Sequence, residues 1–178
     1  MDKTEYYIKR TFEHIRRVQD NMVYLVTKFP EKFLLSDIQI HVLIQNVAHH
    51  DLSKFNNVQW GPYIELTEYY RQRKKLGNES YEYPAGVEKQ IEGAIQSHYN
   101  SENHHPEGLN GTYWDIYMGL ECACDLQAMA QEFGEGSARK YYENVWKQKQ
   151  SKYFKDDGNW AQAQMWMETA IECFEKNL

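Results

Sequence analysis

The chain lacks any apolar run that approaches the roughly 18 residues needed to span a bilayer. Its first 14 residues, MDKTEYYIKRTFEH, also lack the apolar core of a secretory signal peptide. The sequence therefore predicts a soluble cytoplasmic protein that has no membrane partner.

Cysteine is scarce, and its pattern argues against a thiolate metal site. The chain has three cysteines, Cys122, Cys124 and Cys173, and none of them forms a Cys-x-x-Cys pair. We expect all three to be reduced thiols, with Cys122 in the hydrophobic core.

Positive charge is in the minority, since the 178 residues carry a formal net charge of −6. Binding to duplex nucleic acid depends on many contacts between basic side chains and phosphates, and this balance argues against it. The net charge is compatible with a local pocket for a small phosphorylated ligand. It is also compatible with a homo-oligomer. The apolar content of 42% predicts one globular domain over residues 1–178.

Strand-like alternation of apolar and polar residues is absent over any useful length, whereas apolar residues recur with helical spacing almost throughout. We predict an all-α, single-domain bundle of about six to seven helices. Ser36 is a good N-cap for the second of them. The expected helices cover residues 3–28, 36–50, 61–77, 86–99, 113–133, 137–152 and 159–177. A metal-site core would then occupy about 1–133, and a helical pair about 137–177.

Several apolar rows are interrupted by ionisable side chains. The second helix's inner row of Ile40, Leu43 and Val47 is expected to continue onto the histidine and aspartate of the HHDLSKF stretch. Burying a carboxylate costs several kcal/mol unless a positive charge compensates it. A single histidine on an apolar face is often only a hydrogen-bonded core residue, but here four helices and one loop contribute such groups. The residues are His14, His50, Asp51, His98, His104, His105 and Asp125.

Imidazoles and carboxylates that share a pocket are typical ligands of divalent cations. We therefore predict one or two bound ions among Fe, Mn, Zn and Mg, with Asp51 as the natural bridging ligand. His14, His50, Asp51 and Asp125 are the firmest members of this set. His98 and the His104–His105 pair lie only six or seven positions apart, so one of these three histidines can instead have a supporting role.

The order of these residues resembles that of HD-domain metalloproteins. The segment HDLSK is similar to the His-Asp-x-x-Lys form of several HD phosphodiesterases, and HHPEGLNGTYW resembles the His-His-Glu loop of the HD subgroup that hydrolyses cyclic dinucleotides. Pro106 interrupts that second pattern before Glu107. The whole layout also resembles a family of uncharacterised bacterial and phage proteins. The superfamily is all-α and contains many phosphohydrolases and a smaller group of diiron oxygenases.

The resemblance implies a role for each residue. Its metal ligands would be His14, His50, Asp51, His98, His105 and Asp125. Lys54 would hold a phosphate oxygen, although it is equally compatible with a surface cation, and His104 would protonate the leaving oxygen. Glu107 would orient a ligand imidazole from outside the ligand set. Glu121, one turn before Asp125, could support the ligands from outside the ligand set, but such a glutamate is more often an exposed helix residue.

The sequence leaves three functions open. The first is a metal-dependent phosphohydrolase or phosphodiesterase that acts on a nucleotide or another small phosphoester through a metal-activated water. The second is a diiron oxygenase of the HD fold, because the same ligand count of four histidines and two aspartates suits it. The third is a non-catalytic protein that binds a metal or a nucleotide.

Overall fold

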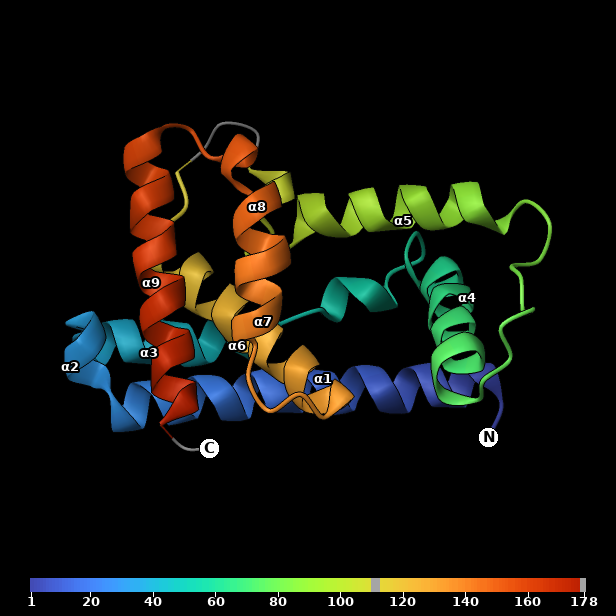
Figure 1. The fold of residues 1–178 in the computed structure, drawn as a ribbon, viewed down its shortest axis with the longest axis horizontal. Helices are drawn as coiled ribbons and strands as arrows, with labels where there is room; N and C mark the ends of the chain where they lie inside the picture. The colour runs from blue at the N-terminus through green and yellow to red at the C-terminus, as the bar shows by residue number, and fades with distance from the viewer. Residues whose placement is uncertain (110–112, 177–178) are drawn as a thin grey trace.

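The computed structural model describes residues 1–109 and 113–176, and every regular element in these ranges is helical. This confirms the prediction of a single all-α domain. In Figure 1, the long helix α1 runs along the bottom of the view, α5 runs roughly parallel to it at the upper right, and α9 and the α7–α8 segment stand upright to the left of α5. The main helices are α1 (Lys3–Lys28), α2 (Pro30–Phe33), α3 (Asp37–Val47), α4 (Trp60–Tyr70), α5 (Val87–Ser101), α6 (Ile116–Phe133), α7 (Arg139–Tyr141), α8 (Lys147–Lys149) and α9 (Asp157–Glu175).

Short segments of tighter or wider helix complete the chain. Helix α4 continues into a π-helical turn at Arg71–Lys75, and a second π-helical turn at Tyr142–Trp146 joins α7 to α8. Single 3₁₀ turns cover Leu52–Phe55, Pro106–Gly108 and Ser151–Tyr153. The predicted C-terminal helical pair corresponds to the α7–α8 segment and α9. No helix in the described ranges is both long enough and apolar enough to cross a membrane.

The hydrophobic core lies where α6 packs between α1 and α9. Small side chains on α6 let its neighbours approach closely: a Cβ atom on Gly119 would lie 3.2 Å from the ring of Trp166. The three cysteines are free and buried, and Cys122 lies in the core as expected. The side chains that lose all contact with solvent include Val18, Met22, Leu25, Leu120, Ala123, Ala128, Met167 and Ile171.

Side-chain caps fix where the helices begin. Ser36 and Gln39 form a reciprocal capping box at the start of α3, which confirms the predicted N-cap. Aspartates cap the three longest helices: the carboxylates of Asp2, Asp115 and Asp156 accept from backbone N–H groups at the starts of α1, α6 and α9. These caps set the register that aims the inner face of each helix.

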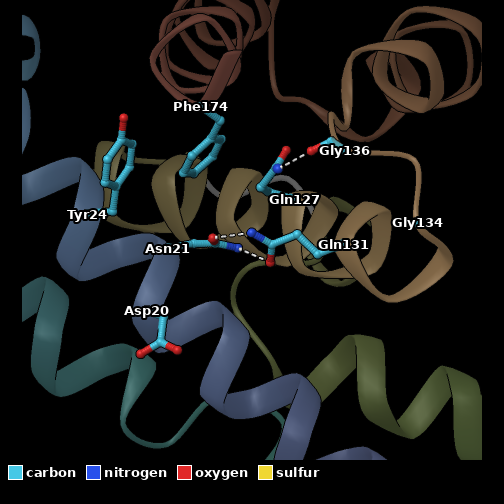
Figure 2. Close-up of a pocket in the computed structure, with 8 residues that line it drawn as sticks. All are labelled: Asp20, Asn21, Tyr24, Gln127, Gln131, Gly134, Gly136 and Phe174. Carbon is cyan, nitrogen blue, oxygen red and sulfur yellow. Dashed lines mark hydrogen bonds between the residues drawn. The ribbon is translucent and has the colours of Figure 1, made fainter. Parts of the chain in front are cut away.

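Amide side chains join α1 to α6 near a pocket of about 480 Å³ that also borders on Phe174 of α9 (Figure 2). Asn21 and Gln131 donate to each other, over 3.3 and 3.0 Å, and Asn21 also donates to the carbonyl of Cys124. Gln127 donates to the carbonyl of Gly136. These amides hold the helices in place, and the ionisable residues that interrupt the apolar rows gather elsewhere.

The second predicted helix ends earlier than expected. Helix α3 stops at Val47, and the chain turns through residues 48–51 before the 3₁₀ turn at Leu52–Phe55. The prediction that the helical row continues onto His50 and Asp51 is therefore wrong. Asp51 has a left-handed backbone with φ 59°, a conformation that aspartate tolerates better than most residues. This turn carries both side chains into the interior.

Leu120 gives a test of the α1–α6–α9 core. Its side chain is fully buried, so Leu120→Ala should leave a cavity and lower the free energy of unfolding by about 2–5 kcal/mol. Urea denaturation followed by circular dichroism measures this change. Met165→Ala on α9, where the side chain is 55% exposed, is the control and should have little effect. Equal stabilities of the two variants would contradict this description of the core.

Candidate metal centre

The predicted ligands converge from five separate parts of the chain. Helix α1 supplies His14, the turn after α3 supplies His50 and Asp51, and the last turns of α5 supply His98. The loop between α5 and α6 contributes a histidine pair, and α6 contributes carboxylates. Five of these side chains are at most 4% exposed: His14, His50, Asp51, His98 and His104. Residues that lie far apart in the sequence thus form one buried cluster.

The first group of potential ligands lies against α1 and α6. Nε2 of His14 lies 3.0 Å from Oδ1 of Asp125 and 3.4 Å from Nε2 of His50. Oδ2 of Asp51 lies beside them, 3.5 Å from Nε2 of His14 and 3.7 Å from Nε2 of His50. The ligand atoms of His14, His50 and Asp125 are close enough together to bind one metal ion.

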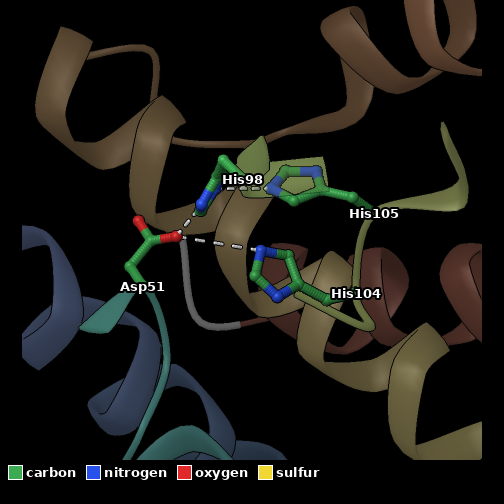
Figure 3. A group of neighbouring side chains, drawn as sticks. All are labelled: Asp51, His98, His104 and His105. Atoms are coloured by element: carbon green, nitrogen blue, oxygen red, sulfur yellow. Dashed lines mark hydrogen bonds and ion pairs between the residues drawn. The ribbon is translucent and has the colours of Figure 1, made fainter. Parts of the chain in front are cut away.

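The second group forms around the other oxygen of the same aspartate (Figure 3). Nε2 of His98 lies 3.1 Å from Oδ1 of Asp51, and Nε2 of His104 lies 4.0 Å from it. Nε2 of His105 lies 3.0 Å from Nε2 of His98. Asp51 therefore presents one carboxylate oxygen to each group, which is the arrangement expected of a ligand that bridges two ions.

Hydrogen bonds at the outer nitrogens fix the tautomers of two imidazoles. Nδ1 of His50 donates to Oε1 of Glu121 over 2.9 Å. Ser53 donates its hydroxyl hydrogen to Oε1 of Gln59, so its oxygen accepts from Nδ1 of His98, 3.0 Å away. When these two rings are neutral and Nδ1 carries the proton, Nε2 of each ring has a free lone pair that faces the inside of the cluster.

Two facing Nε2 atoms can share one hydrogen, as His50 and His14 do over 3.4 Å, or both can bind a cation that lies between them. Ligand atoms that lie roughly 2.1 Å from one ion, at octahedral to tetrahedral angles, are about 3.0–3.4 Å apart. The shortest separations in the two groups, 3.0 to 3.5 Å, have this size. Oδ1 of Asp51 and Nε2 of His104 are also buried without a hydrogen-bond partner. The donor set and its spacing therefore fit divalent metal ions.

Charged neighbours keep the buried acids ionised. Burial opposes ionisation of Asp51, but the Lys54 ammonium and the His50 and His98 imidazoles hold its pKa well below the ordinary value. Burial likewise opposes ionisation of Glu121, whose histidine contacts lower its pKa to about 2. For His50, burial lowers the pKa, but the nearby carboxylates outweigh burial and raise it to about 9. The site thus retains negative charge that attracts cations.

Lys54 lies at the edge of this cluster. Its ammonium group forms an ion pair with Oδ2 of Asp51, and it lies 5.4 Å from the ring centre of Tyr63. Its side chain is 20% exposed, in contrast to the fully enclosed aspartate. Lys54 is therefore a partly exposed cation at the edge of the site, and it is not a lysine on an open surface.

Glu121 is the site residue to which the sequence reasoning gave too little weight. An exposed glutamate was the favoured interpretation over a supporting role, but Glu121 is 8% exposed and lies against His50 and His104. Its position four residues before Asp125, on the same helical face, was the available signal. Glu107 received the supporting role instead, yet the hydrogen bond described for its carboxylate comes from Gln150. Glu121 occupies the place predicted for Glu107.

The chain belongs to the family of unknown function DUF5662, whose model matches residues 3–171. The matched range includes every residue of the metal centre. No curated protein and no solved structure matches the chain. The resemblance to HD-domain proteins therefore stays a prediction, and the function has to be argued from the site.

Two aspartate variants test the division into two groups. Asp51→Asn should lose both ions, because each group depends on one oxygen of this carboxylate. Asp125→Asn should keep one ion, because Asp125 belongs to the first group alone. Titration calorimetry with Mn²⁺ counts the ions bound per chain, and circular dichroism checks that both variants are folded. Equal stoichiometries in the two variants would overturn the assignment.

Proposed function

We propose that this member of DUF5662 is a metal-dependent phosphohydrolase or phosphodiesterase of the HD type. Its substrate would be a nucleotide or another small phosphoester. The observation that carries the proposal is the position of Asp51, which directs its two carboxylate oxygens to two separate groups of histidines. Two divalent ions at such a site supply a nucleophilic water at neutral pH and hold the oxygens of a phosphoryl group for in-line displacement.

The ligand set favours some ions over others. With Asp51 counted in both groups, imidazole nitrogens equal carboxylate oxygens in the first group and outnumber them in the second. Imidazole suits Zn, Fe and Mn, whereas Mg²⁺ prefers oxygen ligands and retains several waters. Among the four metals that the sequence left open, we therefore propose Mn, Fe or Zn.

Lys54 is the proposed phosphate-binding residue. Its ammonium lies beside Asp51 at the partly exposed edge of the site, so a phosphate oxygen can reach it from solvent. A lysine in this place also stabilises negative charge that develops on the phosphoryl oxygens. Its backbone carbonyl accepts from the hydroxyl of the buried Tyr7 over 2.8 Å, which fixes the segment that carries it.

The histidine pair offers a ligand and a proton donor. The sequence suggested His105 as the ligand and His104 as the donor to the leaving oxygen. The structure favours the opposite division, because His104 is 1% exposed whereas His105 is partly exposed. We propose that His105 protonates the leaving oxygen, since this role requires contact with the substrate.

A diiron oxygenase is the second candidate, and the imidazole-rich ligand set is the observation that favours it. An oxygenase needs iron and consumes O₂, whereas a hydrolase needs neither. The third candidate, a non-catalytic metal- or nucleotide-binding protein, predicts bound metal without turnover. The nucleotide substrate, a cytoplasmic location and a homo-oligomer stay predictions.

The reaction class can be tested under argon. The Mn²⁺-loaded protein should hydrolyse a phosphoester from a panel of nucleotides, cyclic dinucleotides and bis(p-nitrophenyl) phosphate, and chelation should abolish the activity. Asp51→Asn is the matched inactive control. Turnover that is absent under argon, and that appears in air only with Fe²⁺ and consumes O₂, would contradict the hydrolase and favour the oxygenase.

Lys54→Met tests the phosphate-binding role. The variant should keep the wild-type number of ions, because methionine has nearly the length of the lysine side chain. It should lose about 10²-fold in kcat/KM, because methionine lacks the positive charge. Steady-state kinetics and Mn²⁺ titration measure the two quantities. Lys89→Met on the exposed side of α5 is the control and should leave both unchanged. Loss of metal from Lys54→Met would show that the lysine supports the ligands instead.

A further inference from the structure

One carboxylate oxygen connects the two groups of the metal centre. Oε1 of Glu121 accepts from Nδ1 of His50 over 2.9 Å and lies 3.4 Å from Nδ1 of His104. The two imidazole rings pack against each other, with their centres 4.3 Å apart. His50 belongs to the first group of ligands, and His104 belongs to the second.

We propose that Glu121 is a positioning residue that couples the occupancy of the two ion positions. The inference rests on the proposed metal centre but not on its chemistry. Glu121 accepts from Nδ1 of His50 and lies beside Nδ1 of His104, so Nε2 of each ring is left free to bind an ion. When the first ion binds, it fixes the orientation of the His50 or His104 ring and of the Glu121 carboxylate beside that ring. The carboxylate then holds the other ring in the orientation that its ion needs, so the second ion binds more favourably.

The placement of Glu121 supports this role. Glu121 lies on helix α6, one turn before Asp125. The helix therefore fixes the distance between the Glu121 carboxylate, which contacts Nδ1 of His50, and the Asp125 carboxylate, which faces Nε2 of His14. Its negative charge also offsets the repulsion between two cations that share Asp51. A residue that only filled space would need neither the charge nor the contact with both rings.

The test is a Mn²⁺ titration followed by electron paramagnetic resonance. With one equivalent of Mn²⁺, the wild-type protein should show the spectrum of a spin-coupled pair, because filled chains carry two ions while others stay empty. Glu121→Gln keeps the shape but removes the charge, and it should show isolated Mn²⁺ together with an affinity lowered by 10–100-fold. Glu121→Asp retains the carboxylate and should restore the paired spectrum in part.

Glu68→Gln is the matched control. Glu68 is also 8% exposed, but it lies on α4 and accepts from Arg71 and Gln72. This variant should titrate as the wild type does. Isolated Mn²⁺ in the wild type at one equivalent, or a paired spectrum with wild-type affinity in Glu121→Gln, would overturn the coupling. Paired binding without phosphoester turnover would overturn the proposed hydrolase and leave the coupling intact.

Discussion

The structure depends on a fully buried carboxylate that is surrounded by the lone pairs of histidines. Asp51 lies between imidazoles from α1, the α3 turn, α5 and the following loop, and its side chain is 2% exposed. In the absence of a metal, Lys54 and protonated His50 are the charges that compensate it. The hydrogen bonds at Nδ1 of His50 and His98 turn both Nε2 atoms toward the same space. Divalent cations bound there would replace the second proton of His50 and compensate the buried carboxylate, which is why the ligand set and its burial belong together.

The rest of the fold holds these groups still. Helix α6 carries Glu121 and Asp125, and its other faces pack against α1 and α9. Stacked aromatic rings of Trp146, Trp114 and Trp160 bind the C-terminal segments to the start of α6. At the other end of the site, fully buried Gln59 orients Ser53 and bonds to the hydroxyls of two α5 serines. Ligand side chains on packed helices lose little conformational freedom when an ion binds, so the packing of the helices contributes directly to ion binding.

Sequence reasoning identified most of the site because apolar periodicity places a residue on a helix face. His14, His98 and Asp125 follow directly from their rows, and the structure brings them together. The end of α3 was missed because a left-handed backbone at Asp51 is allowed for aspartate but not required by it. Glu121 was missed because periodicity gives the face of a glutamate and not its partner. The π-helical turns follow from packing, and no local signal in the sequence marks them.

The openness of the site supports the proposed catalytic role of the ions over a purely structural one. Structural metal sites are closed by protein ligands, whereas catalytic sites keep a position open to substrate. Here the centre of the cluster is sealed, but its rim is not: the side chains of Lys54 and Asp125 are 20% and 15% exposed, and His105 is partly exposed. An ion that only stabilised the fold would be served better by apolar side chains that cover this rim. A rim that combines a cation, a carboxylate and an imidazole is instead suited to bind an anion and move a proton.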